Sequence, residues 1–195
     1  MGYTTDFYGS LSFNKPVAPW LTEYINKFSD TRRMQRDPEK IKQTYSNWGD
    51  MCFNGELGDE GQYFIGGDID YYSNSKDNSS VIDVNTPPVG QPGLWCQWII
   101  NENGELAWDG GEKFYNYEEW LDYLIENFFE PLGYVLNGDI EWQGEESDDF
   151  GIIHVKDNFV EMQYGKRVYS MSELDTADMI AELKSRGFDV IPTAV

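Results

Sequence analysis

A row of carboxylates at helical spacing is the first group of side chains in this sequence that suits a chemical role. Between residues 117 and 130, acidic side chains recur four positions apart, and they are Glu118, Asp122, Glu126 and Glu130, with Glu119 widening the row. Residues four apart share one helix face, at a spacing of about 6 Å along the axis. Like charges at that spacing disfavour a helix by roughly 0.2–0.5 kcal/mol per pair. Two interpretations stay open: a solvated face of an acidic protein, or a surface that imitates the charge of duplex phosphates.

The acidity continues beyond this row. A second run of acids follows, made of Glu145, Glu146, Asp148 and Asp149. Over residues 101–150, fifteen Asp and Glu face a single basic residue, Lys113, whereas residues 1–50 are nearly balanced within a total net charge of −21. Such a surface attracts cations and basic protein faces, and it repels a nucleic-acid backbone. Direct nucleic-acid binding is therefore not expected.

Aromatic and amide side chains form another group, in three short stretches. These are Gln91–Trp98, Trp108–Tyr117 and Glu141–Glu145. Aromatic faces beside a few amides and one cation are typical of ligand pockets, and Trp and Tyr also anchor protein interfaces. Alternating Trp residues on paired strands are equally typical of a core, so core, interface and pocket all stay open. The residues that would line a pocket are Trp95, Gln97, Trp98, Trp108, Glu112, Lys113, Asn116, Trp142 and Gln143.

No residue receives a catalytic role from the sequence. His154 is the only histidine, which excludes a metal site built from two histidines, and we expect neither a metal nor a cofactor. Cys52 and Cys96 lack metal-type spacing and are expected to be reduced thiols. A basic segment from Lys27 to Lys42 could bind phosphate or a nucleotide, but pairing with the acidic part of the same chain or of a neighbouring subunit is the favoured interpretation.

The elements that would position these side chains follow from the periodicity of apolar residues. Even spacing predicts a strand over residues 3–13, and helical spacing predicts helices from Pro19, from Asp37 to Trp48, and over 117–130. The turn at 101–104 predicts a hairpin between residues 94–100 and 105–108. The other expected elements are a short strand at Tyr63–Ile65, a loop at Ser73–Ser80, strands near 133–143, 151–156 and 159–164, a helix from Ser172 to Gly187, and a strand at Phe188–Ile191.

These elements predict a single α+β domain over residues 1–195, with a mainly antiparallel sheet flanked by three to four helices. A near-neutral helical part, 1–50, precedes a strongly acidic β-rich part, 51–195. The aromatic content of 16% argues against a disordered acidic chain. No apolar run approaches the roughly 18 residues that span a bilayer, and the N-terminus lacks a leader pattern. We expect a cytoplasmic protein without membrane contact, and homo-oligomerisation stays open.

Several segments of the chain resemble a family of small acidic proteins encoded by tailed bacteriophages and prophages. The matching segments are MGYTTDFYG, TRRMQRD, PPVGQPGLWCQW, WDGGEKFYNYEEWLDYLIENFF, and GYVLNGDIEWQGEESDDFG with the following VKDN. The last two are the most specific, and the tail after Tyr164 matches poorly. The resemblance implies a viral origin, the cytoplasm of the infected host as location, and no catalytic residues. Small acidic phage proteins are often antagonists of host defence, including DNA mimics that block restriction or CRISPR enzymes, which is an analogy at the level of class.

The leading hypothesis from the sequence is a non-enzymatic interaction protein. Its acidic surface would bind a basic surface of a host protein and occlude a nucleic-acid site there. The alternative from a different class is a small-molecule-binding protein or enzyme that uses the tryptophan-lined pocket. A virion or assembly component is the third hypothesis.

Overall fold

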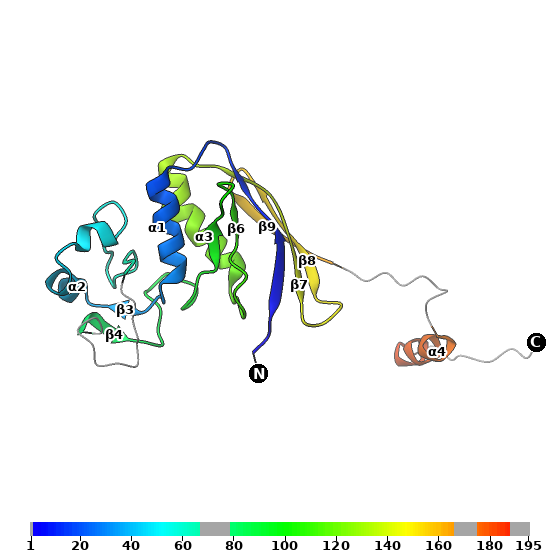
Figure 1. Cartoon of the computed structure of the whole chain (residues 1–195). Coiled ribbons are helices and arrows are strands. Elements are labelled where there is room, and N and C mark those ends of the chain that lie inside the picture. Colours follow the sequence, from blue (N-terminus) through cyan, green and yellow to red (C-terminus); the bar gives the residue numbers. More distant parts are fainter. Residues whose placement is uncertain (1, 67–78, 166–174, 188–195) are drawn as a thin grey trace, which may run out of the picture. The chain divides into compact units, whose positions relative to one another are not determined.

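The computed structural model of this chain describes residues 2–66, 79–165 and 175–187. Residues Met1–Tyr164 form one compact unit and Gly165–Val195 form a second. The predicted α+β class is confirmed, because helices accompany a mainly antiparallel sheet (Figure 1). The predicted loop at Ser73–Ser80, except its last two residues, the helix start at Ser172 and the strand at Phe188–Ile191 lie outside the described residues.

The main sheet has the strand order β1-β7-β8-β9, with the short strand β2 also paired to β7. Its strands are β1 (Thr5–Gly9), β2 (Ser12–Phe13), β7 (Leu136–Gly144), β8 (Phe150–Lys156) and β9 (Phe159–Tyr164), and all pairs are antiparallel. The strand predicted over 3–13 is thus broken into two. Gly9 has φ +106°, and a Cβ built there would lie 2.8 Å from the Asp139 carbonyl oxygen. The chain bends at this glycine because no other residue fits so close to β7.

Two helices and a hairpin cover the inner face of this sheet (Figure 1). The helix α1 spans Pro19–Asp30, as predicted, and packs on the hairpin of β5 (Trp98–Ile100) and β6 (Leu106–Trp108). The helix α3 spans Tyr117–Leu124 and contacts β9. The hairpin predicted between 94–100 and 105–108 is therefore confirmed, with shorter strands.

The segment predicted as one helix over 117–130 is helical throughout, but it is not one α-helix. After α3 comes a π turn at Ile125–Phe129 and then a 3₁₀ turn at Glu130–Leu132. The neighbouring rings of Phe128 and Phe129 are both fully buried. A π turn is wider than an α turn, which lets two adjacent rings face the core. The change of pitch also ends the regular four-residue row of acids before Glu130.

The smaller elements lie beyond α1, on the side away from the sheet (Figure 1). They are β3 (Gln35–Arg36), α2 (Pro38–Thr44), a 3₁₀ turn at Trp48–Met51 and β4 (Val81–Asp83), and β3 pairs with β4. Asp37 caps α2 through its carboxylate, as the sequence signal predicted, but the helix ends at Thr44. The stretch Tyr63–Ile65 is not a strand. In the second unit, α4 spans Thr176–Ser185 and is capped by Asp175.

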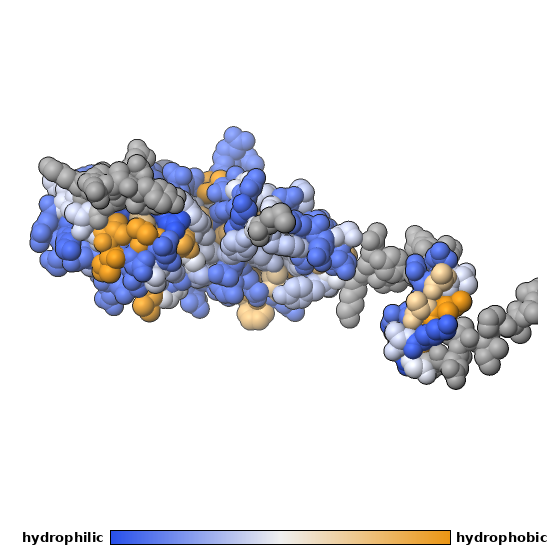
Figure 2. Space-filling model, turned by 90° about the horizontal axis from the view of Figure 1, so that it is seen from below, coloured by the Kyte–Doolittle hydropathy of each residue, from blue (hydrophilic) through white to orange (hydrophobic). Residues whose placement is uncertain are grey.

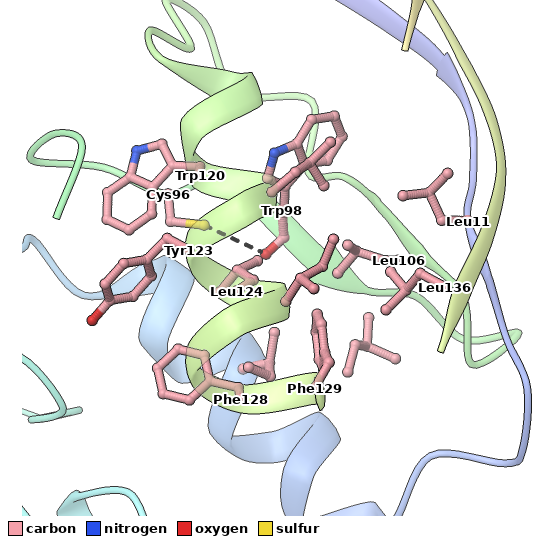
Figure 3. Packing of buried hydrophobic residues seen from close by; sticks show 14 of the residues in the cluster. Leu11, Cys96, Trp98, Leu106, Trp120, Tyr123, Leu124, Phe128, Phe129 and Leu136 are labelled. Carbon is pink, nitrogen blue, oxygen red and sulfur yellow. Dashed lines mark hydrogen bonds between the residues drawn. The ribbon is translucent and has the colours of Figure 1, made fainter. Parts of the chain in front are cut away.

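The core is rich in aromatic rings and divides into two clusters of unequal size. The large cluster lies between α1, α3 and the sheet and includes Trp98, Trp120 and Phe128, all fully buried (Figure 3). The small cluster consists of Ile41, Cys52, Leu57 and Phe64. The view in Figure 2 shows a mostly hydrophilic surface, with hydrophobic side chains gathered at the end of the first unit that carries α2, β3 and β4.

A buried arginine fixes the loops that follow α1. The Arg33 side chain donates from Nη1 to the Phe64 carbonyl (2.8 Å), from Nη2 to the Gln62 carbonyl (2.7 Å) and from Nε to Gln91 Oε1 (3.3 Å). Its guanidinium also lies 4.0 Å from the centre of the Phe28 ring. The basic segment was expected to pair with the acidic part of the chain. Lys27 and Lys42 pair instead with Glu23 and Glu39, within residues 1–50. Arg33 is held by carbonyls and is only 2% exposed.

Candidate functional site

Three carboxylates on α3 and the π turn line one hollow of the surface. Glu119, Asp122 and Glu126 border a concavity of about 530 Å³, which the loop residues Gly90–Pro92 close on the other side. All three side chains are exposed. Among the described residues, none of the ion pairs includes any of them. We call this concavity the acidic hollow. Spacings of three and four residues place its carboxylates on one side of the helix.

Burial and neighbouring like charges both raise the pKa values of acids in this row. Burial raises the pKa of Asp122, and the charges of Glu126 and Glu119 raise it further. Glu118, which was predicted in the same acidic row, does not border the hollow. Burial also raises the pKa of Glu118, with contributions from Glu119 and Asp122. A nearby like charge disfavours ionisation, whereas an opposite charge favours it. A cationic group that entered the hollow would therefore offset the repulsion between these carboxylates.

Two lining residues of the acidic hollow, Gln91 and Tyr123, are connected by hydrogen bonds to the loops that Arg33 contacts. Gln91 accepts from Arg33 and donates through Nε2 to the Gln62 carbonyl (2.7 Å) and to the Tyr123 hydroxyl (3.0 Å). Burial raises the pKa of Tyr123 from its ordinary value near 10 to about 12. Sequence reasoning missed Gln91 and Tyr123 as hollow residues, since the two lie far apart in the chain. The only hint was the turn-forming stretch around Gln91.

The second acidic run lies in the turn between β7 and β8, where part of it is used for structure. Glu145 accepts a hydrogen bond from the Thr4 N–H (2.9 Å), and Asp149 accepts one from the Tyr3 hydroxyl. These two carboxylates hold the N-terminal segment against the turn. Glu146 and Asp148 are exposed.

Charges of both acidic runs act on Tyr117. Burial raises the pKa of Tyr117 to about 12, and Tyr164, Asp149, Glu118 and Glu119 contribute to the rise. The fold therefore brings the β7–β8 turn and the start of α3 within electrostatic reach of one ring. Glu130 is exposed at the opposite end of the helical segment and does not border the acidic hollow.

A second concavity lies next to the acidic hollow and contains most of the predicted pocket residues. It has a volume of about 570 Å³. Its lining includes Trp95, Gln97, Glu112, Lys113 and Asn116, all predicted, together with Tyr115, Leu94, Gly93, Pro87 and Pro92. We call it the Trp95 groove. Trp95 and Tyr115 are 40% and 53% exposed, and an Arg32 guanidinium lies 5.8 Å from the Trp95 ring centre.

The other predicted pocket residues do not border the Trp95 groove. Trp98 and Trp142 are buried in the large cluster, as the core interpretation of the sequence would have them. Trp108 packs against that cluster and donates its Nε1–H to Gln97 Oε1 (3.0 Å), which orients the Gln97 amide. Gln143 lies at the β7–β8 turn. The alternation of side chains along β5 and β6 could not show in advance which Trp residues are buried, because these strands pair over only three residues each.

The wall shared by the two concavities is made by Pro92 and Asn116, which line both. The Asn116 Nδ2 donates to the Pro92 carbonyl (2.6 Å) and makes no cap hydrogen bond to α3. Asn116 has φ 55° and Lys113 has φ 61°, so both adopt the left-handed conformation. Asparagine tolerates that conformation, whereas it is unfavourable for lysine. The segment before α3 is thus held with backbone strain at Lys113, a residue of the Trp95 groove.

Neither a metal site nor a membrane span is found in the described part of the chain. Among the described residues, no group of three or more His, Cys, Asp or Glu is arranged to hold a metal ion. In the same part of the chain, every helix is too short or too polar to cross a bilayer. Comparison of the chain with protein-family models, curated proteins and solved structures returned no match.

Proposed function

We propose that this protein binds a basic surface of another protein through the acidic hollow and the acidic β7–β8 turn. The observation that carries the proposal is the trio Glu119, Asp122 and Glu126. These three acids line a concave surface, are exposed, and have no cationic partner among the described residues. Basic side chains of a partner could form ion pairs with these carboxylates. Charge complementarity of this kind raises association rates and selects partners by the sign of their surface.

The partner proposed is a nucleic-acid-binding protein of a bacterial host. Proteins that bind nucleic acid carry concentrated positive charge. A protein with a net charge of −21 attracts such positively charged surfaces strongly. Occupation of that positive site by the acidic surface would exclude nucleic acid. The resemblance of the chain to phage-encoded proteins supports a host partner and an anti-restriction or anti-CRISPR role.

Charge reversal in the acidic hollow tests the proposal. The test variant carries Glu119→Lys, Asp122→Lys and Glu126→Lys. The matched control carries Glu56→Lys, Glu102→Lys and Glu161→Lys, three exposed acids outside both acidic runs. Each variant changes three charges by two units, from −21 to −15, so non-specific attraction falls equally. We expect a nucleic-acid-binding host protein to be retained by the immobilised wild type and the control and lost by the test variant.

Two further measurements complete this experiment. Duplex DNA added in solution should displace the captured protein, and a wash at about 0.5 M NaCl, where the Debye length falls to roughly 4 Å, should release it. Equal capture by both triple variants, or capture that DNA does not compete with, would show that the acidic hollow is only a solvated face.

A further inference from the structure

The acidic hollow and the Trp95 groove form one continuous binding surface of mixed chemistry. They share Pro92 and Asn116, whose hydrogen bond of 2.6 Å forms the ridge between them. On one side of the ridge lie three carboxylates, and on the other lie two exposed aromatic rings. An occupant that extended across this ridge would meet negative charge and apolar surface in succession.

The Trp95 groove suits an apolar side chain of a polypeptide. Trp95 and Tyr115 are exposed on the surface of the folded protein, and Pro87 and Pro92 extend the apolar lining. Exposed aromatic rings of this type are the usual anchors of protein interfaces. Lys113, the cation in the groove lining, lies 3.8 Å from Glu112, so its charge is offset locally.

We infer that the partner places an extended segment across the ridge, with Lys or Arg in the acidic hollow and a neighbouring large apolar side chain on Trp95 and Tyr115. This inference rests on the proposed function, because the basic part of the segment belongs to the partner proposed there. It goes further in assigning selectivity to the Trp95 groove: charge attracts many basic surfaces, and the groove retains only those with an apolar anchor beside the charge.

Short labelled peptides of defined sequence test the inference directly. The probes are fluorescein-labelled Lys-Arg-Trp-Lys-Arg, the same peptide with Ala in place of Trp, and Glu-Glu-Trp-Glu-Glu, with binding followed by fluorescence anisotropy. We expect the first peptide to bind at least about tenfold more tightly than the second, as for an anchor residue at an interface, and the third not to bind.

Variants of the protein assign the two halves of the peptide to the two concavities. Trp95→Ala should remove the advantage of the Trp-containing peptide and leave the salt dependence unchanged, and Tyr115→Ala should do so in part. The matched control is Trp20→Ala, which truncates a tryptophan of similar exposure, 48%, on α1. Glu119→Gln with Asp122→Asn should weaken both basic peptides and reduce their salt dependence. Thermal melting confirms that each variant is folded.

Different failures have different meanings. If both basic peptides bind equally well and Trp95→Ala has no effect, the inference is wrong, while the proposed function stands on the acidic hollow alone. If neither basic peptide binds, both are overturned. If the acidic Trp peptide binds as well as the basic one, the groove takes an apolar ligand unaided by charge, and the inference is again wrong.

Discussion

At the scale of single residues, the acidic hollow opposes stability. Asp122 lies between Glu119 and Glu126, and its raised pKa reflects burial first and these two charges second. Its folded-state pKa lies above the unfolded value, so the folded state binds the proton more tightly. The corresponding stability is fully present below the unfolded pKa of about 3.9 and is lost as the pH rises through the folded value.

The variant Asp122→Asn should therefore stabilise the protein at pH 7. The expected gain in the free energy of unfolding is a few tenths of a kcal/mol for each like-charge repulsion that the substitution removes. This gain should shrink towards zero as the pH is lowered to about 4. Urea unfolding at several pH values measures it. The control is Glu102→Gln, at an exposed turn, which should change little. A gain that is absent at pH 7, or that grows on acidification, would contradict this account of Asp122.

At the scale of elements, the β7–β8 turn is organised by one amide. The Gln143 Nε2 donates to the carbonyls of Gly144, Glu146 and Asp149, at distances between 2.9 and 3.1 Å. A side chain predicted to line a pocket thus holds together a turn that carries four carboxylates. Its hydrogen bonds add to two within the backbone of the turn, from the Gly144 N–H to the Asp149 carbonyl (2.7 Å) and from the Asp149 N–H to the Glu146 carbonyl (3.1 Å).

Replacing this amide tests the organisation of the turn. Gln143→Ala should lower the free energy of unfolding by about 1 kcal/mol, the usual worth of a partly buried hydrogen bond. Amide hydrogen exchange should accelerate in residues 144–150 and leave β5 and β6 unchanged. Gln97→Ala, which loses an amide in the Trp95 groove, is the matched control. Unaltered exchange in the turn would show that the carbonyls do not depend on Gln143.

Local patterns predicted most of these elements and little of the site. Helical and alternating periodicity depends on neighbours in sequence, so α1 and the strands β7, β8 and β9 were predicted within a few residues. The break at Gly9 depends on the approach of β7, and the π turn depends on burying Phe128 and Phe129 together, so neither was predicted. The hollow required Gln91 to meet Tyr123, which only the tertiary fold decides.

At the scale of the whole molecule, charge has two opposite effects. A net charge of −21 repels itself within the compact state, and the same charge attracts a basic partner. Dissolved salt screens both interactions. Stability and partner binding should therefore respond to salt with opposite signs.

Thermal melting in NaCl measures the first of these effects. Between about 0.01 and 0.5 M, where the Debye length falls from about 30 Å to about 4 Å, the Tm should rise by several degrees. The variant with Glu56, Glu102 and Glu161 changed to Lys has a net charge of −15 and should show a smaller rise. A Tm that falls with NaCl would mean that self-repulsion is not a significant force in the fold.

Each of the two core clusters contains one cysteine thiol. Cys52 belongs to the small cluster and Cys96 to the large one, and both are free and buried. Burial raises the pKa of the Cys96 thiol to about 12 and also raises that of Cys52. Thiolates, not thiols, react with alkylating reagents. Alkylation of Cys52 should therefore report the opening of the small cluster beside α2, and alkylation of Cys96 the opening of the large cluster.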